Sequence, residues 1–228
     1  MHYRVRYATT RPELKGDWQG EAWSQADTLE IAHFRPEGSD HQPQTLARLL
    51  WDEHGIHGIF QVQDRYVRCA QTGYMVPTYL DSCVEIFLQP KRDKGYLNFE
   101  FSCGGSLLCF YIVDPTRVPG GFHDFTRLPH VDGRQVFIYH SMPERVEPEI
   151  AEPTEWYLEF SIPFPVLEKW VGPLRPVGGQ EWRANLYKCG DETSHPHWAS
   201  WAPLDSLNFH LPHCFGTIHF EEVPRDGT

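Results

Sequence analysis

Short runs of β-branched and aromatic residues, broken by turn-forming residues, are the feature that most limits how this chain folds. Turn sequences such as Gly104-Gly105, Asp132-Gly133 and Gly178-Gly179 separate these runs. With 18 Gly and 19 Pro there is little room for long helices, and Pro163–Val171 is the best short one. The predicted strands are Leu29–Phe34, Thr45–Asp52, Gly58–Gln63, Cys83–Gln89, Leu97–Ser102, Leu107–Val113, Gln135–His140, Trp156–Ile162, Glu181–Lys188 and Gly216–Glu222.

Many short strands with regular turns predict an all-β fold, either a β-sandwich or a jelly-roll-like arrangement. No shift in composition marks a domain boundary, and the sequence contains no internal repeat. We therefore expect one domain over residues 1–228. The segment Met142–Glu155 is rich in Glu and Pro and is predicted to be an exposed connection.

The charge of the chain limits the partners that it can attract. It has 20 basic and 31 acidic residues, giving a formal net charge of −11, and it contains no basic run. Nucleic acids and anionic membrane surfaces are therefore excluded as expected partners. No apolar run approaches the length of a membrane span.

The N-terminus and the cysteines both bear on the expected location. Met1–Tyr7 contains no apolar signal region, so a cytoplasmic location is expected for the chain as written. Removal of a leader would instead indicate secretion. The six cysteines are scattered through apolar contexts without a C-x-x-C pair, and we expect all of them to be free thiols.

The segment Glu181–Lys188 and the residues after it carry side chains suited to a polyhydroxy ligand. In a strand, Arg183, Asn185 and Tyr187 share one face. Trp198 and Trp201 follow, and an indole stacks well on the C–H-rich face of a sugar ring. The alternative is that each tryptophan anchors the core or a loop.

A second group of polar residues surrounds the predicted strand Cys83–Gln89. Asp81 follows Tyr79 in the turn before the strand, and Glu85 lies in the middle of its hydrophobic sequence. The next strand places Asn98 and Glu100 on one face. An acidic residue in such a strand is costly unless it is paired. Glu85 is therefore either a ligand-binding residue or the partner of Arg183 in a structural ion pair.

Several motifs in order resemble the family 9 carbohydrate-binding modules, in particular the family 9-like branch. They span about Trp51 to Phe220 and are Asp81-Ser-Cys-Val-Glu-Ile-Phe87, Tyr96-Leu-Asn-Phe-Glu-Phe101, Glu155-Trp-Tyr-Leu-Glu-Phe-Ser-Ile-Pro-Phe164, Trp182-Arg-Ala-Asn-Leu-Tyr187 and Asn208-Phe-His-Leu-Pro-His-Cys-Phe-Gly216. The resemblance implies an immunoglobulin-like sandwich of two antiparallel sheets. It also implies a sugar held between two aromatic side chains, and a possible structural calcium ion away from the sugar.

The family's signature Asp-Ser-Val-Glu matches Asp81, Ser82 and Glu85, with one additional residue here. The tryptophan that precedes this signature in the family is missing, and Tyr79 or Tyr74 would take its place. The second aromatic residue would be Trp198 or Trp201. These correspondences place the predicted site where Asp81–Glu85, Asn98–Glu100 and Arg183–Tyr187 converge.

The predicted function is non-catalytic binding of a glycan or an oligosaccharide end. One alternative is a carbohydrate-active enzyme that uses Glu85 and Glu100 as a carboxylate pair. A second alternative is a metal- or haem-binding sandwich in which histidines ring the metal. Those histidines would be His195, His197, His210 and His213. The sequence identifies neither the glycan nor a protein partner.

Overall fold

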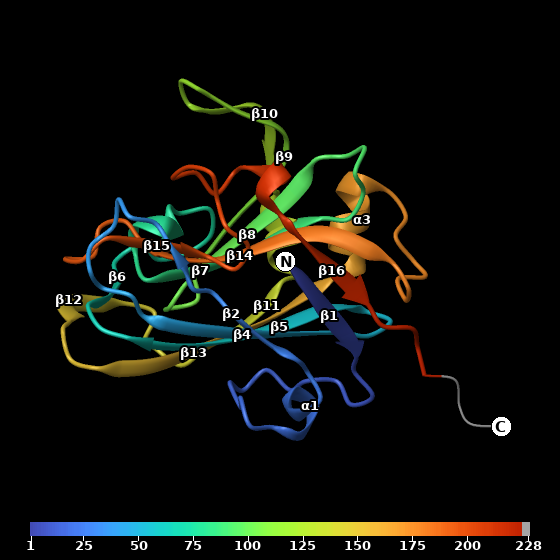
Figure 1. Cartoon of the computed structure of the whole chain (residues 1–228), viewed down its shortest axis with the longest axis horizontal. Coiled ribbons are helices and arrows are strands. Elements are labelled where there is room, and N and C mark those ends of the chain that lie inside the picture. Colours follow the sequence, from blue (N-terminus) through green and yellow to red (C-terminus); the bar gives the residue numbers. More distant parts are fainter. Residues whose placement is uncertain (225–228) are drawn as a thin grey trace.

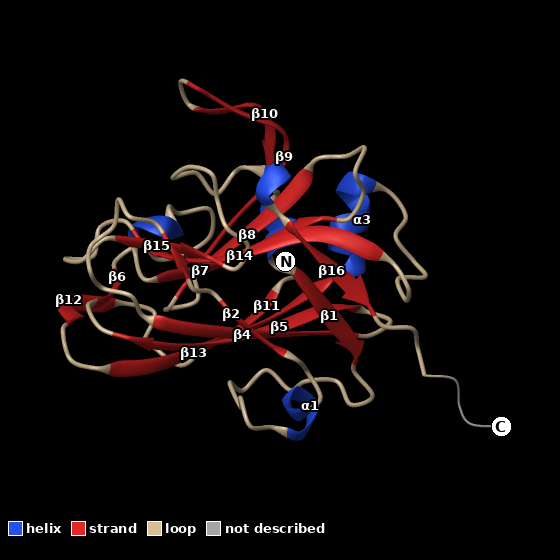
Figure 2. Cartoon of the chain, in the orientation of Figure 1, coloured by secondary structure: helices blue, strands red, loops and turns tan. Residues whose placement is uncertain are grey.

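The computed structural model describes residues 1–224, which form two layers of β-structure with very little helix (Figure 2). Sheet A contains β3 (His33–Phe34), β7 (Cys83–Gln89), β8 (Tyr96–Ser102), β9 (Leu107–Val118), β10 (Gly121–Arg127), β14 (Glu181–Gly190), β15 (His197–Ser200) and β16 (Gly216–Phe220). Sheet B contains β2 (Thr28–Glu30), β4 (Gln44–Trp51), β5 (Gly55–Asp64), β11 (Phe137–His140) and β13 (Thr154–Pro163). In Figure 1, sheet A is the upper layer and sheet B the lower.

The remaining elements are short. A separate two-stranded sheet pairs β6 (Val67–Cys69) with β12 (Val146–Ile150). The helices are α1 (Glu21–Ser24), α2 (His130–Gly133) and α3 (Phe164–Val171), with the 3₁₀ turns η1 (Thr78–Leu80) and η2 (Pro212–Cys214). Within residues 1–224, no helix is long and apolar enough to cross a membrane.

The strand β1 (His2–Tyr7) connects the two sheets. Its first part pairs with β16 in sheet A, and Arg6 and Tyr7 pair with β4 in sheet B. Both pairings are parallel, which corrects the expectation of two purely antiparallel sheets. The strand β1 was not predicted from the sequence, although Tyr3 and Val5 alternate with more exposed residues as in a half-buried strand.

The core lies between the sheets and follows the period of two expected for strands. Val84, Ile86 and Leu88 of β7 point inward and belong to one large cluster with side chains of sheet B such as Phe60 and Trp156. The helix α3 lies at one end of the two layers (Figure 1) and adds apolar side chains to this cluster. The β-sandwich predicted from the strand pattern is therefore confirmed.

The outer faces of both sheets are also partly covered. On sheet B, the segment around α1 buries Trp18 and Trp23 against Leu50 and Ile59. On sheet A, residues from the segment 202–215 pack on Phe87 and Tyr187. This second cover leaves the neighbouring part of the outer face of sheet A free to form a pocket.

A buried ion pair joins the two sheets. Asp64 lies at the end of β5 and Lys188 on the inner face of β14; Lys188 Nζ is 3.3 Å from Asp64 Oδ2, and both side chains are fully buried. The same Nζ is 2.6 Å from Nε2 of His197. His197 Nδ1 lies 2.9 Å from the carbonyl oxygen of His195, so Nδ1 carries the proton and Nε2 accepts from the lysine.

The charge states in this network follow from its burial. Burial and the nearby Lys188 ammonium lower the pKa of His197 to about 3, so its imidazole is neutral at pH 7. Burial disfavours the Asp64 carboxylate, but Lys188 and a hydrogen bond from His41 (2.8 Å) outweigh it and hold the pKa of Asp64 well below its usual range. The charges of Lys188 and Asp64 therefore balance each other inside the core, and His197 adds no charge.

All ten predicted strands and the predicted helix overlap elements of the structure, with Leu29–Phe34 divided between β2 and β3. The prediction for Met142–Glu155 needs correction, because this segment contains β12, whose Val146 is buried against β6. The strands β6, β10, β12 and β15 were missed. They are short or carry polar sequences, and they depend on pairing with distant segments.

We predict that Asp64 and Lys188 are energetically coupled. Removing one partner leaves the other charge uncompensated in the core, so Lys188→Met and Asp64→Asn should each lower the free energy of unfolding by about 3–5 kcal/mol. The double variant should cost clearly less than the sum of the two. Denaturant unfolding of all four proteins tests this. The exposed pair Arg145–Glu147 supplies a control in Arg145→Met, which should change stability little. Strict additivity would contradict the coupling.

Candidate functional site

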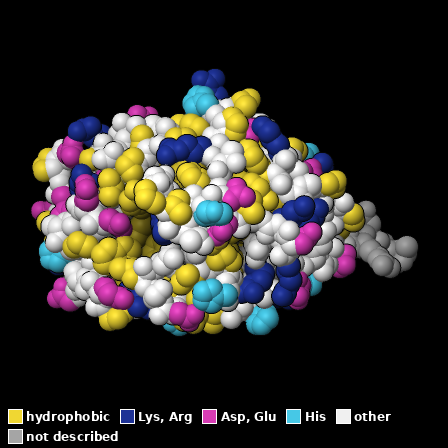
Figure 3. Space-filling view, turned by 90° about the horizontal axis from the view of Figure 1, so that it is seen from above, with side chains coloured by type: hydrophobic (Ala, Val, Ile, Leu, Met, Phe, Trp, Pro, Cys, Tyr) yellow, Lys and Arg dark blue, Asp and Glu magenta, His cyan; other side chains and the backbone are white. Residues whose placement is uncertain are grey.

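A pocket of about 830 Å³ opens on the outer face of sheet A, between the β9–β10 hairpin and the segment 207–210. Figure 3 shows the face that carries this hairpin, on which hydrophobic side chains gather around a hollow. The aromatic lining residues are Tyr79, Phe110, Phe122, Phe125, Trp198 and Phe209. The polar lining residues are Glu85, Glu100, Arg117, Arg127, Asp191, Asn208 and His210.

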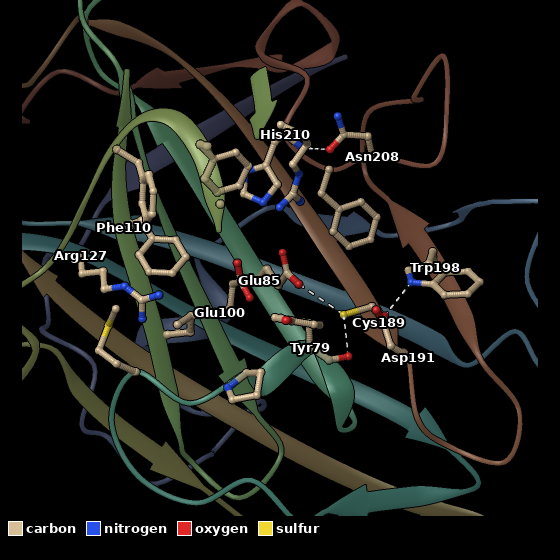
Figure 4. A pocket seen from close by; sticks show the side chains of 18 of the residues that line it. Tyr79, Glu85, Glu100, Phe110, Arg127, Cys189, Asp191, Trp198, Asn208 and His210 are labelled. Carbon is tan, nitrogen blue, oxygen red and sulfur yellow. Dashed lines mark hydrogen bonds between the residues drawn. The ribbon is translucent and has the colours of Figure 1, made fainter. Parts of the chain in front are cut away.

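Two glutamates on neighbouring strands form the floor of the pocket. Glu85 of β7 lies directly opposite Glu100 of β8 in the antiparallel register, and their exposures are 2% and 4%. Oε1 of Glu85 accepts a hydrogen bond from the thiol of Cys189 at 3.3 Å, and Oε1 of Glu100 accepts one from Nδ2 of Asn98 at 2.6 Å. The Oε2 atoms of both glutamates are buried and have no hydrogen-bond partner within the described chain. Figure 4 shows these carboxyl groups in the middle of the pocket.

The environment of the two glutamates favours their protonated forms. Burial is the main cause, and it raises the pKa of Glu85 well above its ordinary value, with Glu100 adding repulsion. Burial likewise raises the pKa of Glu100, against the hydrogen bond from Asn98. Strongly shifted carboxyl groups inside a cavity are typical of functional sites.

Aromatic side chains form the walls. In Figure 4, Phe110 and Arg127 lie on one side of the two glutamates and Trp198 on the other. The indole of Trp198, on β15, is fixed by a 2.7 Å hydrogen bond from its Nε1 to Asp191. Tyr79 lies in the turn η1 and is 39% exposed, so much of its ring faces solvent.

The β9–β10 hairpin supplies another wall and projects beyond sheet A (Figure 1). Its cations rest on aromatic rings: the guanidinium of Arg117 lies 4.2 Å from the ring centre of Phe122, and that of Arg127 lies 5.6 Å from Phe110. Phe122 and Phe125 pack edge to face at 5.6 Å. The hairpin therefore combines apolar surface with positive charge at the mouth of the pocket.

The segment after β15 closes the remaining side. His210 is buried, and its Nδ1 lies 2.8 Å from the hydroxyl of Tyr96. Burial lowers the pKa of His210 well below its usual range, with Arg117 acting in the same direction. Asn208 Oδ1 accepts from the backbone N–H of His210 at 3.0 Å. The pocket thus offers a neutral imidazole and an amide beside its two acidic residues.

Residues 23–220 of the chain match the family described as carbohydrate-binding family 9. The chain belongs to this family. No curated protein sequence matches the chain significantly.

Solved structures show the same fold. A crystal structure of a proposed carbohydrate-binding protein from Bacteroides uniformis is 25% identical, with a TM-score of 0.80 over 96% of this chain and 99% of the other. A family 9 module from Caldicellulosiruptor kristjanssonii in complex with cellotriose is 14% identical, with a TM-score of 0.66 over the whole of both chains. The glucose complex of such a module from the same organism is 13% identical, with a TM-score of 0.65 over 98% of each chain.

Four residues predicted from the sequence line the pocket of this family 9 domain: Tyr79, Glu85, Glu100 and Trp198. Tyr74, the alternative to Tyr79, lies elsewhere and donates to the carbonyl oxygen of Leu128 at 2.7 Å. Asn98 is completely buried behind the floor. Its Nδ2 bonds Glu100, and its Oδ1 accepts from the backbone of Phe110 at 2.8 Å.

Three other predicted residues of β14 bond the segment that covers sheet A and do not line the pocket. Arg183 donates to the carbonyl oxygens of His213 and Phe215. Asn185 donates from Nδ2 to Ala202 at 3.0 Å, and Tyr187 donates to Phe209 at 2.9 Å. These contacts hold the covering segment that carries the pocket wall.

The predicted Glu85–Arg183 pair is not formed. Glu85 is opposite Tyr187 in the register, whereas Arg183 is opposite Gln89, four residues further along the strand. At about 3.3 Å per residue this separates the two groups by roughly 13 Å along the sheet. The prediction that Arg183 lies beside Glu85 in the site is therefore wrong.

Two further predicted residues are buried outside the pocket. Trp201 belongs to the main core, where it packs edge to face on Tyr3 with ring centres 6.4 Å apart. Asp81 organises the turn before β7: its carboxylate accepts from Arg68 at 2.6 Å and from the backbone N–H of Gln71 at 2.7 Å. Neither side chain lines the wall or the floor.

The four histidines of the metal hypothesis do not meet at one point. His197 bonds Lys188 in the core, and His195 stacks on Tyr66 with ring centres 3.6 Å apart. His213 pairs with Asp205 at the surface at 2.8 Å, whereas His210 lines the pocket. The prediction that these four side chains share a metal or haem site is therefore wrong.

The calcium ion implied by the resemblance requires six to eight oxygen ligands. Across residues 1–224, three groups of side chains cluster in the manner of metal ligands: His41–Asp64–His197, Cys83–Glu85–Cys189 and Asp205–His213–Cys214. Each contains a single carboxylate residue, and the first already holds the Lys188 ammonium. None of these groups fits calcium.

We predict that the floor glutamates make the fold less stable as the pH rises. Their pKa values are higher in the folded than in the unfolded protein, so the folded state binds more protons above about pH 4.3, and stability falls with increasing pH. Glu85→Gln and Glu100→Gln should each lose less unfolding free energy than the wild type between pH 5 and pH 8. Denaturant unfolding at several pH values measures this. Glu13→Gln, at an exposed site, is the control. Parallel pH profiles for all four proteins would contradict the assignment.

Proposed function

We propose that the pocket binds the terminal sugar of a glycan and that the domain is a non-catalytic binding module. The observation that carries this proposal is the combination of an indole wall, Trp198, with a floor of two buried carboxyl groups, Glu85 and Glu100. Membership of carbohydrate-binding family 9 supports it. The cellotriose and glucose complexes of the Caldicellulosiruptor modules support it further.

The two parts of the site suit the two kinds of surface on a sugar ring. Trp198 and Tyr79 offer flat apolar faces for the C–H groups of the ring. The unpaired Oε2 atoms of Glu85 and Glu100 exchange hydrogen bonds with sugar hydroxyl groups, which offsets the cost of burying these atoms without a partner. Asn208 adds an amide to the lining, beside His210. A pocket of about 830 Å³ accommodates one or two sugar rings.

Binding without hydrolysis agrees better with the position of the glutamates. Glycosidases place their two carboxyl groups on either side of the bond that they break. Here Glu85 and Glu100 lie side by side on adjacent strands of one sheet. They therefore approach a ligand from the same side.

We predict that Trp198→Ala weakens sugar binding about 5- to 10-fold, the loss expected for a stacked aromatic contact on the order of 1 kcal/mol. Isothermal titration with glucose, cellobiose and cellotriose measures the affinities. Trp198→Phe keeps a ring in place but removes the N–H group that bonds Asp191, so it should retain most of the affinity.

Phe137→Ala provides the matched control, because Phe137 is 53% exposed on β11 and does not line the pocket. It should bind sugars as the wild type does. Unchanged affinity in Trp198→Ala would contradict the proposed wall. Release of reducing sugar from these oligosaccharides would contradict the non-catalytic assignment.

A further inference from the structure

The floor of the pocket contains acidic groups that have no salt-bridge partner within residues 1–224. Glu85 and Glu100 are buried side by side, and each directs one oxygen atom that lacks any hydrogen-bond partner in the described chain. Asp191 lines the same pocket and bonds Trp198. None of the three forms an ion pair within residues 1–224 at 4.0 Å or less.

We propose that the pocket prefers a sugar that carries a protonated amino group, such as the terminal hexosamine of a de-N-acetylated glycan. This inference rests on the proposed sugar-binding function and specifies its ligand class. A cationic ligand would supply the positive charge that the chain itself does not bring to the floor.

Within residues 1–224, the two arginines at the pocket form no ion pair with the floor. Burial raises the pKa of Glu100, and the charge of Arg117 opposes this rise only in part. Arg117 and Arg127 both extend from the β9–β10 hairpin, and their guanidinium groups rest on the rings of Phe122 and Phe110. By contrast, the core carboxylate Asp64 has Lys188 within 3.3 Å. Inside the sandwich, Asp64 thus has a cationic partner, whereas Glu85 and Glu100 at the pocket floor have none within 4.0 Å in the described chain.

An ammonium group matches the geometry of this floor better than a hydroxyl group. It has three N–H donors and no acceptor, and its positive charge favours the ionised form of the floor carboxyl groups, in which their free Oε2 atoms accept. A hydroxyl group donates one hydrogen bond only. Hydrogen bonds between an ammonium and a carboxylate are also about twice as strong as bonds between neutral groups.

Titration of the intact domain with glucose, glucosamine and N-acetylglucosamine at pH 6 tests the proposal, because the amine is then protonated. Burial keeps the floor carboxyl groups protonated in the free domain, so glucosamine binding should also release a proton, which the dependence of the binding heat on buffer measures. Glucosamine should bind about tenfold more tightly than glucose, the difference expected between charge-assisted and neutral hydrogen bonds. N-acetylglucosamine, which is neutral, should show no such gain. Glucose binding that equals or exceeds glucosamine binding overturns the preference while leaving the proposed function intact. Absence of binding for all three sugars and for cellotriose overturns the proposed function itself.

Variants of the floor identify the groups responsible. Glu85→Gln and Glu100→Gln are nearly isosteric, and each should reduce the preference for glucosamine several-fold while glucose binding persists. Asp205→Asn removes a carboxylate whose side chain is 75% exposed and should leave the preference unchanged. A preference that survives both glutamine variants overturns the proposal. A preference that emerges only in Arg117→Gln also overturns it, because Arg117 would then neutralise the floor in the wild type.

Discussion

The ion pair between Asp64 and Lys188 is the interaction on which the arrangement of this sandwich depends. Here a charged group of sheet B meets one of sheet A inside a core formed mainly by apolar side chains. Apolar contacts between two sheets tolerate small shifts, whereas a buried charge pair with defined hydrogen bonds fixes one relative position. His197, which accepts from Lys188, belongs to the strand that carries Trp198. The position of the indole wall is therefore tied to the core through adjacent residues.

The outer face of sheet A is divided between two tasks. Alternate residues of β7 face it, and Phe87 lies under the covering segment, while Glu85 lies at the floor of the pocket. Tyr187, directly opposite Glu85, bonds that segment through its hydroxyl group. One strand pair thus supplies both the floor and the anchor of the wall beside it. The two carboxyl groups of the floor are therefore held in a buried position although neither has an ion-pair partner in the described chain.

The fold could be predicted from the sequence to a large extent, because alternation and turn residues are local signals. The sequence also predicted that Glu85 and Arg183 lie close together. This prediction was wrong because alternation within a strand does not give the separation of two residues along the sheet, which depends on the register between β7 and β14. Trp201 was also a candidate for the wall. Its side chain points into the core, whereas that of Trp198 is half-buried at the outer face. Phe110, Arg117 and His210 reach the pocket through a hairpin and a loop whose positions depend on distant contacts.

The β9–β10 hairpin has a consequence for how such a domain diversifies. Its two strands pair mainly with each other beyond the sheet, and residues 113–121 of the hairpin are largely exposed. The floor, by contrast, consists of central strands that also form the core. Substitutions, insertions or deletions in the hairpin can therefore alter the mouth of the pocket at little cost to folding. Evolution can thus change the mouth of the pocket while the residues of the floor stay under the constraint of the core.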